Sequence, residues 1–145
     1  MLKNAFLDGG LSVPFQLDPM VVCPSREQIF MFSAVTWNRH LIHFCESHAK
    51  QEGHRDILVQ RGLLGNFLAN QLEKDLGELA EIRRLSWHVL SSAYPNQPLI
   101  CQTRVREMFV QEGKTFLRTE SSICDDQGRM VVKGDGELEF NSIGI

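Results

Sequence analysis

One short segment of the chain brings two imidazoles and an amide together. His40 and His43 follow Asn38 within a stretch rich in aromatic and polar residues. An imidazole with an ordinary pKa of about 6.5 takes up and releases protons at neutral pH, which suits His43 to acid–base catalysis. Asn38 cannot ionise, so its amide could orient a water molecule but could not accept a proton from it. A histidine taken alone more often makes a structural hydrogen bond, so the wider context must decide between these roles.

The other histidines and the cysteines predict neither a metal site nor a disulfide framework. Histidines at positions i and i+3, with no third ligand in view, make a weak case for a metal, and we expect none. The remaining histidines have no partner pattern and are expected at the surface or in strands: His48, His54 and His88. The cysteines are widely spaced without a CxxC pair, so reduced, buried thiols are expected at Cys23, Cys45, Cys101 and Cys124.

Helical signals surround and follow this segment. Ser25 is a predicted N-cap with Gln28 at the capping-box position, ahead of a short helix whose apolar residues are 29–32. Residues 48–52 predict further helical turns. The clearest helix spans about 62–76, where apolar residues recur at helical spacing, namely Leu63, Leu64, Phe67, Leu68, Leu72 and Leu76.

After this helix the pattern changes to an alternation of apolar and polar residues. Leu85, Trp87 and Val89 alternate with Ser86 and His88, which predicts a strand in this region. Three further strands are expected at 99–110, 115–124 and 130–140, joined by hairpin turns at 111–114 and 125–128. The second half of the chain therefore predicts an antiparallel meander.

The order of these elements predicts an α+β fold. Residues 1–24, punctuated by Gly9-Gly10 and three prolines, are expected to be irregular and to supply a short edge strand or wrap over the core. A sheet with one apolar face and a single long helix buries both surfaces most simply when the sheet curls around the helix. We expect one such domain over residues 1–145.

The segment from residue 32 to residue 43 closely resembles a known enzyme signature. It reads Phe32-Ser33-Ala34-Val35-Thr36-Trp37-Asn38-Arg39-His40-Leu41-Ile42-His43. It is similar to the signature of MaoC-like (R)-specific enoyl-CoA hydratases and 3-hydroxyacyl-thioester dehydratases, in the branch that reads roughly F-S-A-x-T-x-N-x-H-x-I-H. A weaker likeness continues through residues 57–64, and the whole resemblance covers about 25–140. It implies a hot-dog fold, in which an antiparallel sheet wraps around one long helix.

The resemblance also implies an activity and roles for particular residues. Members of this family add water reversibly across a trans-2-enoyl thioester of CoA or a carrier protein, giving the (R)-3-hydroxyacyl thioester. The family pattern D-x-N-x-x-H places its His at His43, its Asn at His40 and its Asp at Asn38. Because Asn38 cannot ionise, we expect His43 to act as the acid and base, while Asn38 and His40 orient the water.

The start of the long helix supplies the second part of the expected site. A backbone N–H at a helix N-terminus can stabilise the charge that develops on the thioester oxygen, and Gly62 is preferred over Arg61 as this donor. Arg61 is also the best candidate for a contact with substrate phosphates, because a guanidinium binds phosphate in a bidentate fork. Trp37 is a further candidate for substrate binding, with simple packing as its ordinary role.

Composition narrows the remaining possibilities. The chain has 145 residues, 43% hydrophobic and 23% charged, which fits one globular domain. A net charge of −3 and a pI near 5.9 argue against nucleic acid as the main partner. No apolar run reaches the roughly 18–20 residues of a membrane span, and residues 1–10 lack the apolar core of a signal peptide. We expect a cytoplasmic protein without a separate cofactor, since CoA or the carrier is part of the substrate.

Two other functions stay open at this point. Hot-dog proteins also hydrolyse acyl-CoA thioesters, but the helix carboxylates Glu73 and Asp75 lie at its far end. The chain could instead be a non-catalytic subunit that completes a heteromeric MaoC-like dehydratase, because Asn38, Cys45 and Arg61 depart from the better-known family pattern. The expected assembly is accordingly a homodimer, or a heterodimer with another hot-dog subunit.

Overall fold

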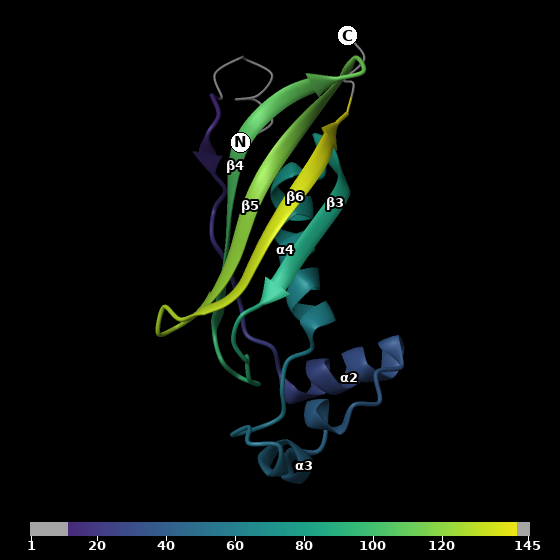
Figure 1. Cartoon of the computed structure of the whole chain (residues 1–145), viewed down its shortest axis with the longest axis vertical. Coiled ribbons are helices and arrows are strands. Elements are labelled where there is room, and N and C mark those ends of the chain that lie inside the picture. Colours follow the sequence, from purple (N-terminus) through teal and green to yellow (C-terminus); the bar gives the residue numbers. More distant parts are fainter. Residues whose placement is uncertain (1–11, 142–145) are drawn as a thin grey trace.

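The computed structural model of the protein describes residues 12–141 (Figure 1). Two short strands come first, followed by the helices and then by four long strands. In chain order the elements are β1 (Phe15–Gln16), β2 (Met20–Val22), α2 (Arg26–Thr36), the 3-10 helix η1 (Leu41–His43), α3 (Glu46–Gln51), α4 (Arg61–Leu76), β3 (Ala80–Val89), β4 (Leu99–Gln111), β5 (Lys114–Asp125) and β6 (Met130–Phe140).

The strands form one antiparallel sheet in the order β1-β4-β5-β6-β3, and β2 also pairs with β4. The predicted meander is confirmed for β4, β5 and β6, but β3 lies beyond β6 and pairs with it, so the chain crosses over between β3 and β4. Strand β3 begins at Ala80, well before the expected strand near residues 85–89. Its first half carries three charged residues, and the register shifts between Ile82 and Arg84, so the alternation that marks a strand is broken there.

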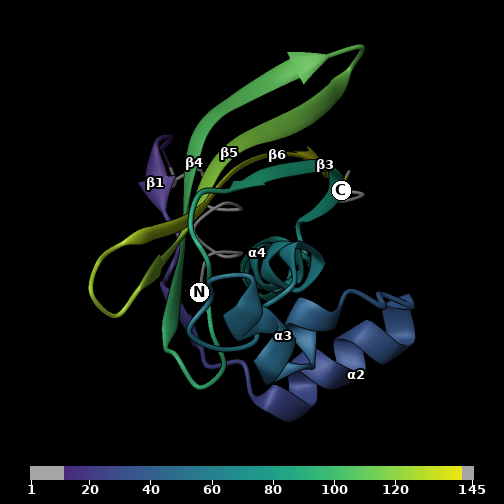
Figure 2. The same ribbon diagram turned by 60° about the horizontal axis from the view of Figure 1, so that its bottom comes forward.

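Helix α4 lies along one face of this sheet, and the strands curve over it (Figure 2). Eight of its residues are buried, including Leu64, Leu68, Leu72 and Leu76. Leu72 and Leu76 share a buried cluster with the strand residue Leu117, whereas Leu64 and Leu68 belong to a second cluster with Ile123. Each fully buried aliphatic side chain contributes about 1.5–3 kcal/mol relative to exposure, so this single helix organises the core. The expected long helix is confirmed and begins at Arg61.

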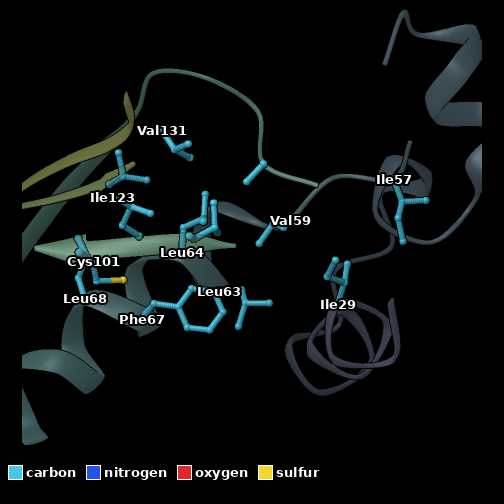
Figure 3. Close-up of a cluster of buried hydrophobic side chains, with 13 residues drawn as sticks. Ile29, Ile57, Val59, Leu63, Leu64, Phe67, Leu68, Cys101, Ile123 and Val131 are labelled. Carbon is cyan, nitrogen blue, oxygen red and sulfur yellow. The ribbon is translucent and has the colours of Figure 1, made fainter. Parts of the chain in front are cut away.

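The core continues beyond the sheet to the helical segment before α4. Figure 3 shows Leu63, Leu64 and Phe67 of α4 between the strand residues Ile123 and Val131 on one side and Val59 on the other. Ile29 of α2 and Ile57 belong to the same buried cluster. Helices α2 and α3 therefore lie at the N-terminal end of α4, as Figure 1 shows.

The beginning of the chain supplies edge strands, as expected. Both β1 and β2 pair with the outer side of β4, with Phe15 opposite Val105 and Met20 opposite Cys101. Leu17, between these two strands, is fully buried. Residues 1–24 are thus only partly irregular, and the first eleven lie outside the described residues, as do 142–145.

Candidate active site

The segment that carries the histidines begins where α2 ends. Ser25 caps the start of α2, its hydroxyl accepting a hydrogen bond from the backbone N–H of Gln28 at 3.1 Å. At the other end Trp37 adopts a left-handed conformation with φ of 54°, and the backbone N–H of Asn38 returns to the carbonyl of Ser33 at 2.9 Å. This reversal ends the helix and turns the chain toward His40 and His43.

Asn38 stabilises the turn that follows. Its side-chain oxygen accepts a hydrogen bond from the backbone N–H of His40 at 3.1 Å. An asparagine that bonds the backbone two residues ahead forms an Asx turn, so one lone pair of the Asn38 amide oxygen is already occupied. Its amide N–H groups and the second lone pair of the oxygen are left to contact a ligand or a water.

His43 is half-buried and is held by one specific contact. Its Nδ1 lies 2.9 Å from the carbonyl oxygen of Leu58. Because a carbonyl only accepts hydrogen bonds, Nδ1 must carry the proton in the neutral ring, and Nε2 is then left with a free lone pair. The structure therefore selects the tautomer in which Nε2 can act as a base.

The surroundings of His43 favour this neutral form. Burial lowers the pKa of the imidazole, the hydrogen bond to Leu58 opposes that shift, and the neighbouring His40 lowers the pKa further. The net pKa lies below the usual value for histidine. The rings of His40 and His43 have their centroids 6.0 Å apart, close enough for one charge to disfavour the other. His43 is thus unprotonated at neutral pH.

The N-terminus of α4 begins shortly after Leu58. The first intrahelical bond runs from the N–H of Leu64 to the carbonyl of Gln60, and the Gln60 side chain does not cap the helix. The N–H groups of residues 61–63 therefore have no partner within the helix. Arg61 and Gly62 are exposed at this point. A side chain on Gly62 would contact the ring of Phe32 at 3.1 Å, so a glycine lets α2 approach the helix start closely.

Gln60 ties these parts together, and the sequence analysis did not single it out. It is 1% exposed, and its Nε2 donates to the carbonyl of Ile29 and to the hydroxyl of Ser33, both at 2.7 Å. Both acceptors belong to α2, so one amide fixes that helix against the start of α4. The Oε1 atom of Gln60 is buried and has no hydrogen-bond partner among the described residues. No motif or periodicity in the sequence marks this contact.

The structure places Arg61 against β3 rather than free in solvent. Its guanidinium stacks on the ring of Trp87 at 4.9 Å and donates to the Trp87 carbonyl at 2.9 Å. The Trp87 indole N–H in turn donates to the Arg61 carbonyl at 3.0 Å. The indole also packs directly on Gly65, where any added Cβ would lie 2.2 Å from it. These reciprocal contacts between Arg61 and Trp87 fix the start of α4 against β3.

An apolar surface surrounds the histidine segment. The large side chains of α2 and η1 that reach solvent are Phe30, Met31, Val35, Trp37, Leu41 and Phe44, with exposures from 38% to 81%. Trp37 itself is 75% exposed, with the Arg39 guanidinium 5.9 Å from its ring. Of the apolar residues expected to pack beneath α2, Ile29 is buried, whereas Phe30 and Met31 are more than half exposed. The rings of Phe30 and Phe44 pack edge to face with centroids 6.5 Å apart, so part of this surface is contiguous, and contiguous exposed apolar patches often mark binding sites.

Three further observations concern the cysteines, metal binding and membrane spans. Cys101 is buried, with a pKa raised to about 12 by burial, whereas Cys23 is exposed and all four cysteines are free. Across residues 12–141, no three His, Cys, Asp or Glu side chains come together in a way that could hold a metal. In the same part of the chain, no helix is both long and apolar enough to cross a membrane.

The fold is shared with solved structures of other proteins. One chain of the ChsH1-ChsH2 complex from Mycobacterium tuberculosis aligns with a TM-score of 0.79 at 16% identity, over 90% of this chain and 98% of that one. The (R)-hydratase from A. caviae involved in PHA biosynthesis aligns with a TM-score of 0.81 at 14% identity, also over 90% and 98%. The sheet wrapped around α4 is thus a hot-dog fold, as the sequence predicted.

Family membership follows from the sequence match. The family model described as hydroxyacyl-thioester dehydratase type 2 matches residues 15–95, more than half of the chain. The protein belongs to this family. It is also similar to the mitochondrial hydroxyacyl-thioester dehydratase type 2 of Schizosaccharomyces pombe, with 26% identity over 107 residues. That match covers 72% of this chain but only 36% of the yeast protein, so the chain spans about a third of its relative.

Proposed function

We propose that the protein catalyses the reversible hydration of an enoyl thioester to a 3-hydroxyacyl thioester carried by CoA or a carrier protein. One observation carries the proposal: the Nδ1–H of His43 is held by the Leu58 carbonyl, which leaves Nε2 as a free base. The two residues after Leu58 lead into the unpartnered N–H groups of α4. Family membership and the hot-dog fold both support this activity.

The proposed hydration proceeds through His43 in two proton transfers. Nε2 accepts a proton from water while the water oxygen bonds to C3 of the enoyl group, and the electron pair of the C2–C3 double bond moves toward the thioester carbonyl. The backbone N–H groups of Gly62 and Arg61, at the positive end of α4, stabilise the negative oxygen that forms. The imidazolium then returns its proton to C2, and dehydration is the reverse. No separate cofactor enters the scheme.

Asn38 has a limited part in this scheme. Its oxygen already accepts from the His40 backbone, so its amide N–H groups are the best placed to bind the water or the product hydroxyl, and they can orient it but cannot take its proton. His40 lies beside His43 and can orient the same water from the solvent side. The indole of Trp37 and the neighbouring apolar surface would contact the acyl chain. Arg61 acts through its backbone and its contact with Trp87.

The assembly we propose is a pair of hot-dog units, either two copies or this chain with another hot-dog subunit. Strand β3 ends the sheet, so its outer side is available for pairing within the described part of the chain. The structurally similar ChsH1-ChsH2 complex has two differently named subunits, which supports the heteromeric form. We place the protein in the cytoplasm on its sequence alone; the yeast relative is named as mitochondrial.

A non-catalytic subunit is the second candidate. It is favoured by one observation: the side chain of His43 contacts the Leu58 carbonyl and has no carboxylate partner among the described residues. In that case the second hot-dog subunit would carry the acid and base.

A single assay separates these functions. Purified protein is mixed with crotonyl-CoA, and the loss of enoyl absorbance is followed together with the release of free thiol. We expect absorbance loss without thiol release. Thiol release without hydration would replace the proposal with a thioesterase. Inactivity at every acyl length, reversed when a second hot-dog subunit is co-expressed, would instead support the non-catalytic subunit.

A further inference from the structure

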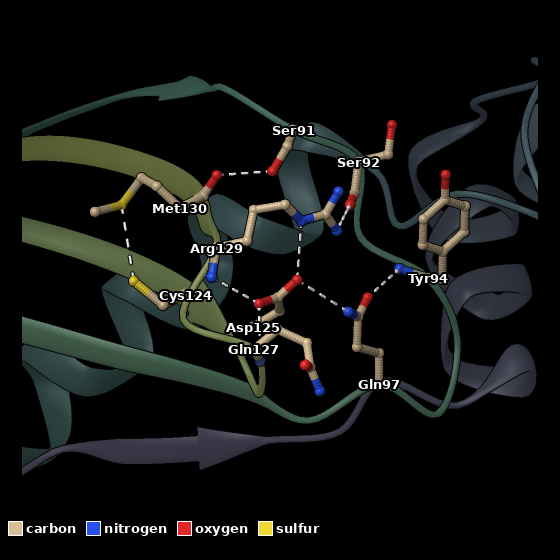
Figure 4. A network of polar contacts seen from close by, with 9 residues as sticks. All are labelled: Ser91, Ser92, Tyr94, Gln97, Cys124, Asp125, Gln127, Arg129 and Met130. Carbon is tan, nitrogen blue, oxygen red and sulfur yellow. Dashed lines mark hydrogen bonds and ion pairs between the residues drawn. The ribbon is translucent and has the colours of Figure 1, made fainter.

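A second polar site lies between the loop after β3 and the turn joining β5 to β6. It is a surface pocket of about 350 Å³. Its walls come from residues far apart in the sequence, namely Arg55, Tyr94, Gln97, Asp125, Gln127 and Arg129. Figure 4 shows the side chains of Arg129, Asp125 and Gln97 bridging the turn and the loop, with Tyr94 next along that loop. The hydration scheme uses none of these residues.

The one carboxylate of the pocket is fully engaged. Asp125 is 3% exposed and accepts hydrogen bonds from the backbone N–H groups of Gln127 and Arg129 at 3.0 and 2.8 Å. It also receives the Arg129 guanidinium at 2.9 Å and the Gln97 amide at 3.3 Å. Burial would raise the pKa of Asp125, but these contacts with Arg129 and Gln127 outweigh it and hold the pKa below its usual value. The Asp125 and Arg129 charges therefore cancel.

Arg55 adds a positive charge that nothing in the pocket neutralises. Its guanidinium stacks over the Tyr94 ring at 4.2 Å, and it forms no ion pair with any carboxylate among residues 12–141. The adjacent carboxylate, Asp56, is bound by both of its oxygens to Arg26 at 2.7 Å. The phenol oxygen of Tyr94 also has no hydrogen-bond partner in this part of the chain. A stacked guanidinium with free N–H edges is pre-organised for a phosphate.

Hydrogen bonds hold two walls of this pocket, the Arg129 side chain and the loop that carries Tyr94. Arg129 is anchored by Asp125 and by a bond from its Nη2 to the Ser92 carbonyl at 3.0 Å. The loop that carries Tyr94 is held by two hydrogen bonds. The Tyr94 N–H donates to the Gln97 side chain, and the Asn96 N–H donates to the Pro24 carbonyl. An anion would thus meet groups already in position, so little side-chain entropy is lost on binding.

The pocket borders the backbone that holds His43. The carbonyl of Ala93, next to Tyr94, accepts a hydrogen bond from the Val59 N–H at 2.9 Å. Val59 follows Leu58, whose carbonyl receives the His43 imidazole. Arg55 comes just before this same segment. A group bound in the pocket is therefore connected through one extended stretch of chain, residues 57–60, to both the catalytic imidazole and the start of α4.

We propose that this pocket binds the phosphate of the phosphopantetheine arm, which CoA and carrier-protein substrates share. The proposal builds on the hydration of such thioesters proposed above. Arg55 provides the charge and the fork of donors, and the Tyr94 hydroxyl and Gln127 amide provide further hydrogen bonds. The pocket anchors the arm while its thioester reaches the helix start, so it determines substrate affinity and leaves the chemical step unchanged.

Kinetics of Arg55→Gln test this site against a matched control. With crotonyl-CoA we expect KM to rise about tenfold and kcat to stay unchanged, the pattern of a contact equally strong in ground and transition states. Arg104→Gln, which removes an exposed guanidinium from the outer face of the sheet, should change neither value. With crotonyl-N-acetylcysteamine, which has the thioester but no phosphate, Arg55→Gln and the wild type should be equal. An equal KM rise with this truncated substrate would overturn the proposal.

The source of the phosphate is tested by the carrier. Arg55→Gln should raise KM for crotonyl-CoA and for crotonyl carried on phosphopantetheine of a carrier protein by similar factors, because both have this phosphate. An effect confined to crotonyl-CoA would assign the pocket to another phosphate of CoA and contradict the inference.

A binding measurement keeps the inference separate from the proposed function. Titration calorimetry with 4′-phosphopantetheine needs no turnover, and we expect heat of binding in the wild type that is lost in Arg55→Gln. If the wild type binds this ligand through Arg55 but hydrates no thioester, the proposed function is refuted and the proposed phosphate site is supported. Absence of binding to the wild type would refute the site itself, whatever the activity.

Discussion

The two ends of α4 differ in what surrounds them. At the C-terminal end Leu72 and Leu76 are fully buried among apolar residues of β1, β4, β5 and β6 and the chain beside them. At the N-terminal end Arg61 and Gly62 are exposed, and Gln60 keeps a buried oxygen without a partner among the described residues. Both ends carry such an acceptor, because Oδ2 of Asp75 near the C-terminus is also buried without a partner among the described residues. The two ends differ in exposure, so we call the C-terminal one the closed end and the N-terminal one the open end.

This difference indicates how the fold divides stability from function. Unsatisfied N–H groups and exposed apolar side chains are tolerated where a ligand or a partner can cover them. The apolar surface of α2 and η1 is found at this open end, whereas Leu72 and Leu76 at the closed end are fully covered by the core. One helix therefore provides a hydrophobic anchor at one terminus and a binding site at the other.

The largest expected effect comes from damage to the closed end. Leu72→Ala would remove a fully buried side chain and leave a cavity, lowering the free energy of unfolding by about 2–5 kcal/mol. Chemical denaturation measures this change. The hydration rate per folded molecule should stay at the wild-type value, and a selective loss of kcat without loss of stability would show that the two ends are not independent.

Gln60→Leu tests the open end, with a smaller effect on stability. The change keeps the volume and removes both hydrogen bonds to α2, but it also removes the unpartnered Oε1, so the unfolding free energy should fall by only about 1 kcal/mol. Gln60 directly precedes α4, and α2 leads to His43. Without these hydrogen bonds the His43 imidazole and the N–H donors of α4 should shift relative to one another, so kcat should fall at least about tenfold. Gln71→Leu, which alters a buried glutamine in the middle of the helix, is the matched control.

In that comparison only the Gln60 variant should lose kcat. An equal loss of kcat in both variants would mean that general destabilisation explains the effect, and not the hydrogen bonds that connect Gln60 to α2.

Much of the fold could be predicted because its long helix and most of its strands show regular patterns of apolar residues along the sequence. The apolar period of residues 63–76 and the alternation in β4, β5 and β6 persist over many residues, and Ser25 caps α2 as expected. The start of β3 could not be predicted in this way. It is an edge strand with charged residues facing solvent, and its bulge shifts the period where the strand begins.

From the sequence, the site could be predicted only as a motif of residue types, without the contacts that these residues make. The pattern around His43 marked the imidazole, but the Leu58 carbonyl that selects its tautomer is a backbone atom and has no sequence signal. Gln60 is an ordinary polar residue whose partners lie about thirty positions earlier. Arg61 illustrates the converse, since a residue selected for its charge turns out to stack on Trp87, a contact that depends on how α4 meets β3.

The smallest expected effect concerns pH. His40 lowers the pKa of His43, so His40→Gln should raise it and move the acidic limb of kcat/KM to higher pH. In the wild type that limb should lie below the usual histidine range, because burial also favours the neutral imidazole. Rates measured across the acidic range test this, with His88→Gln on β3 as a control that should leave the profile unchanged. A shift to lower pH in His40→Gln would contradict the electrostatic account.

The central claim is that the free Nε2 of His43 carries the proton transfers, and His43→Gln tests it most directly. The glutamine amide can still donate to the Leu58 carbonyl, so the melting temperature should stay close to that of the wild type, yet no basic nitrogen remains. We predict that the crotonyl-CoA hydration rate falls about 10²–10⁴-fold, the usual contribution of general acid–base catalysis. A folded His43→Gln protein that hydrates crotonyl-CoA at the wild-type rate would contradict the account.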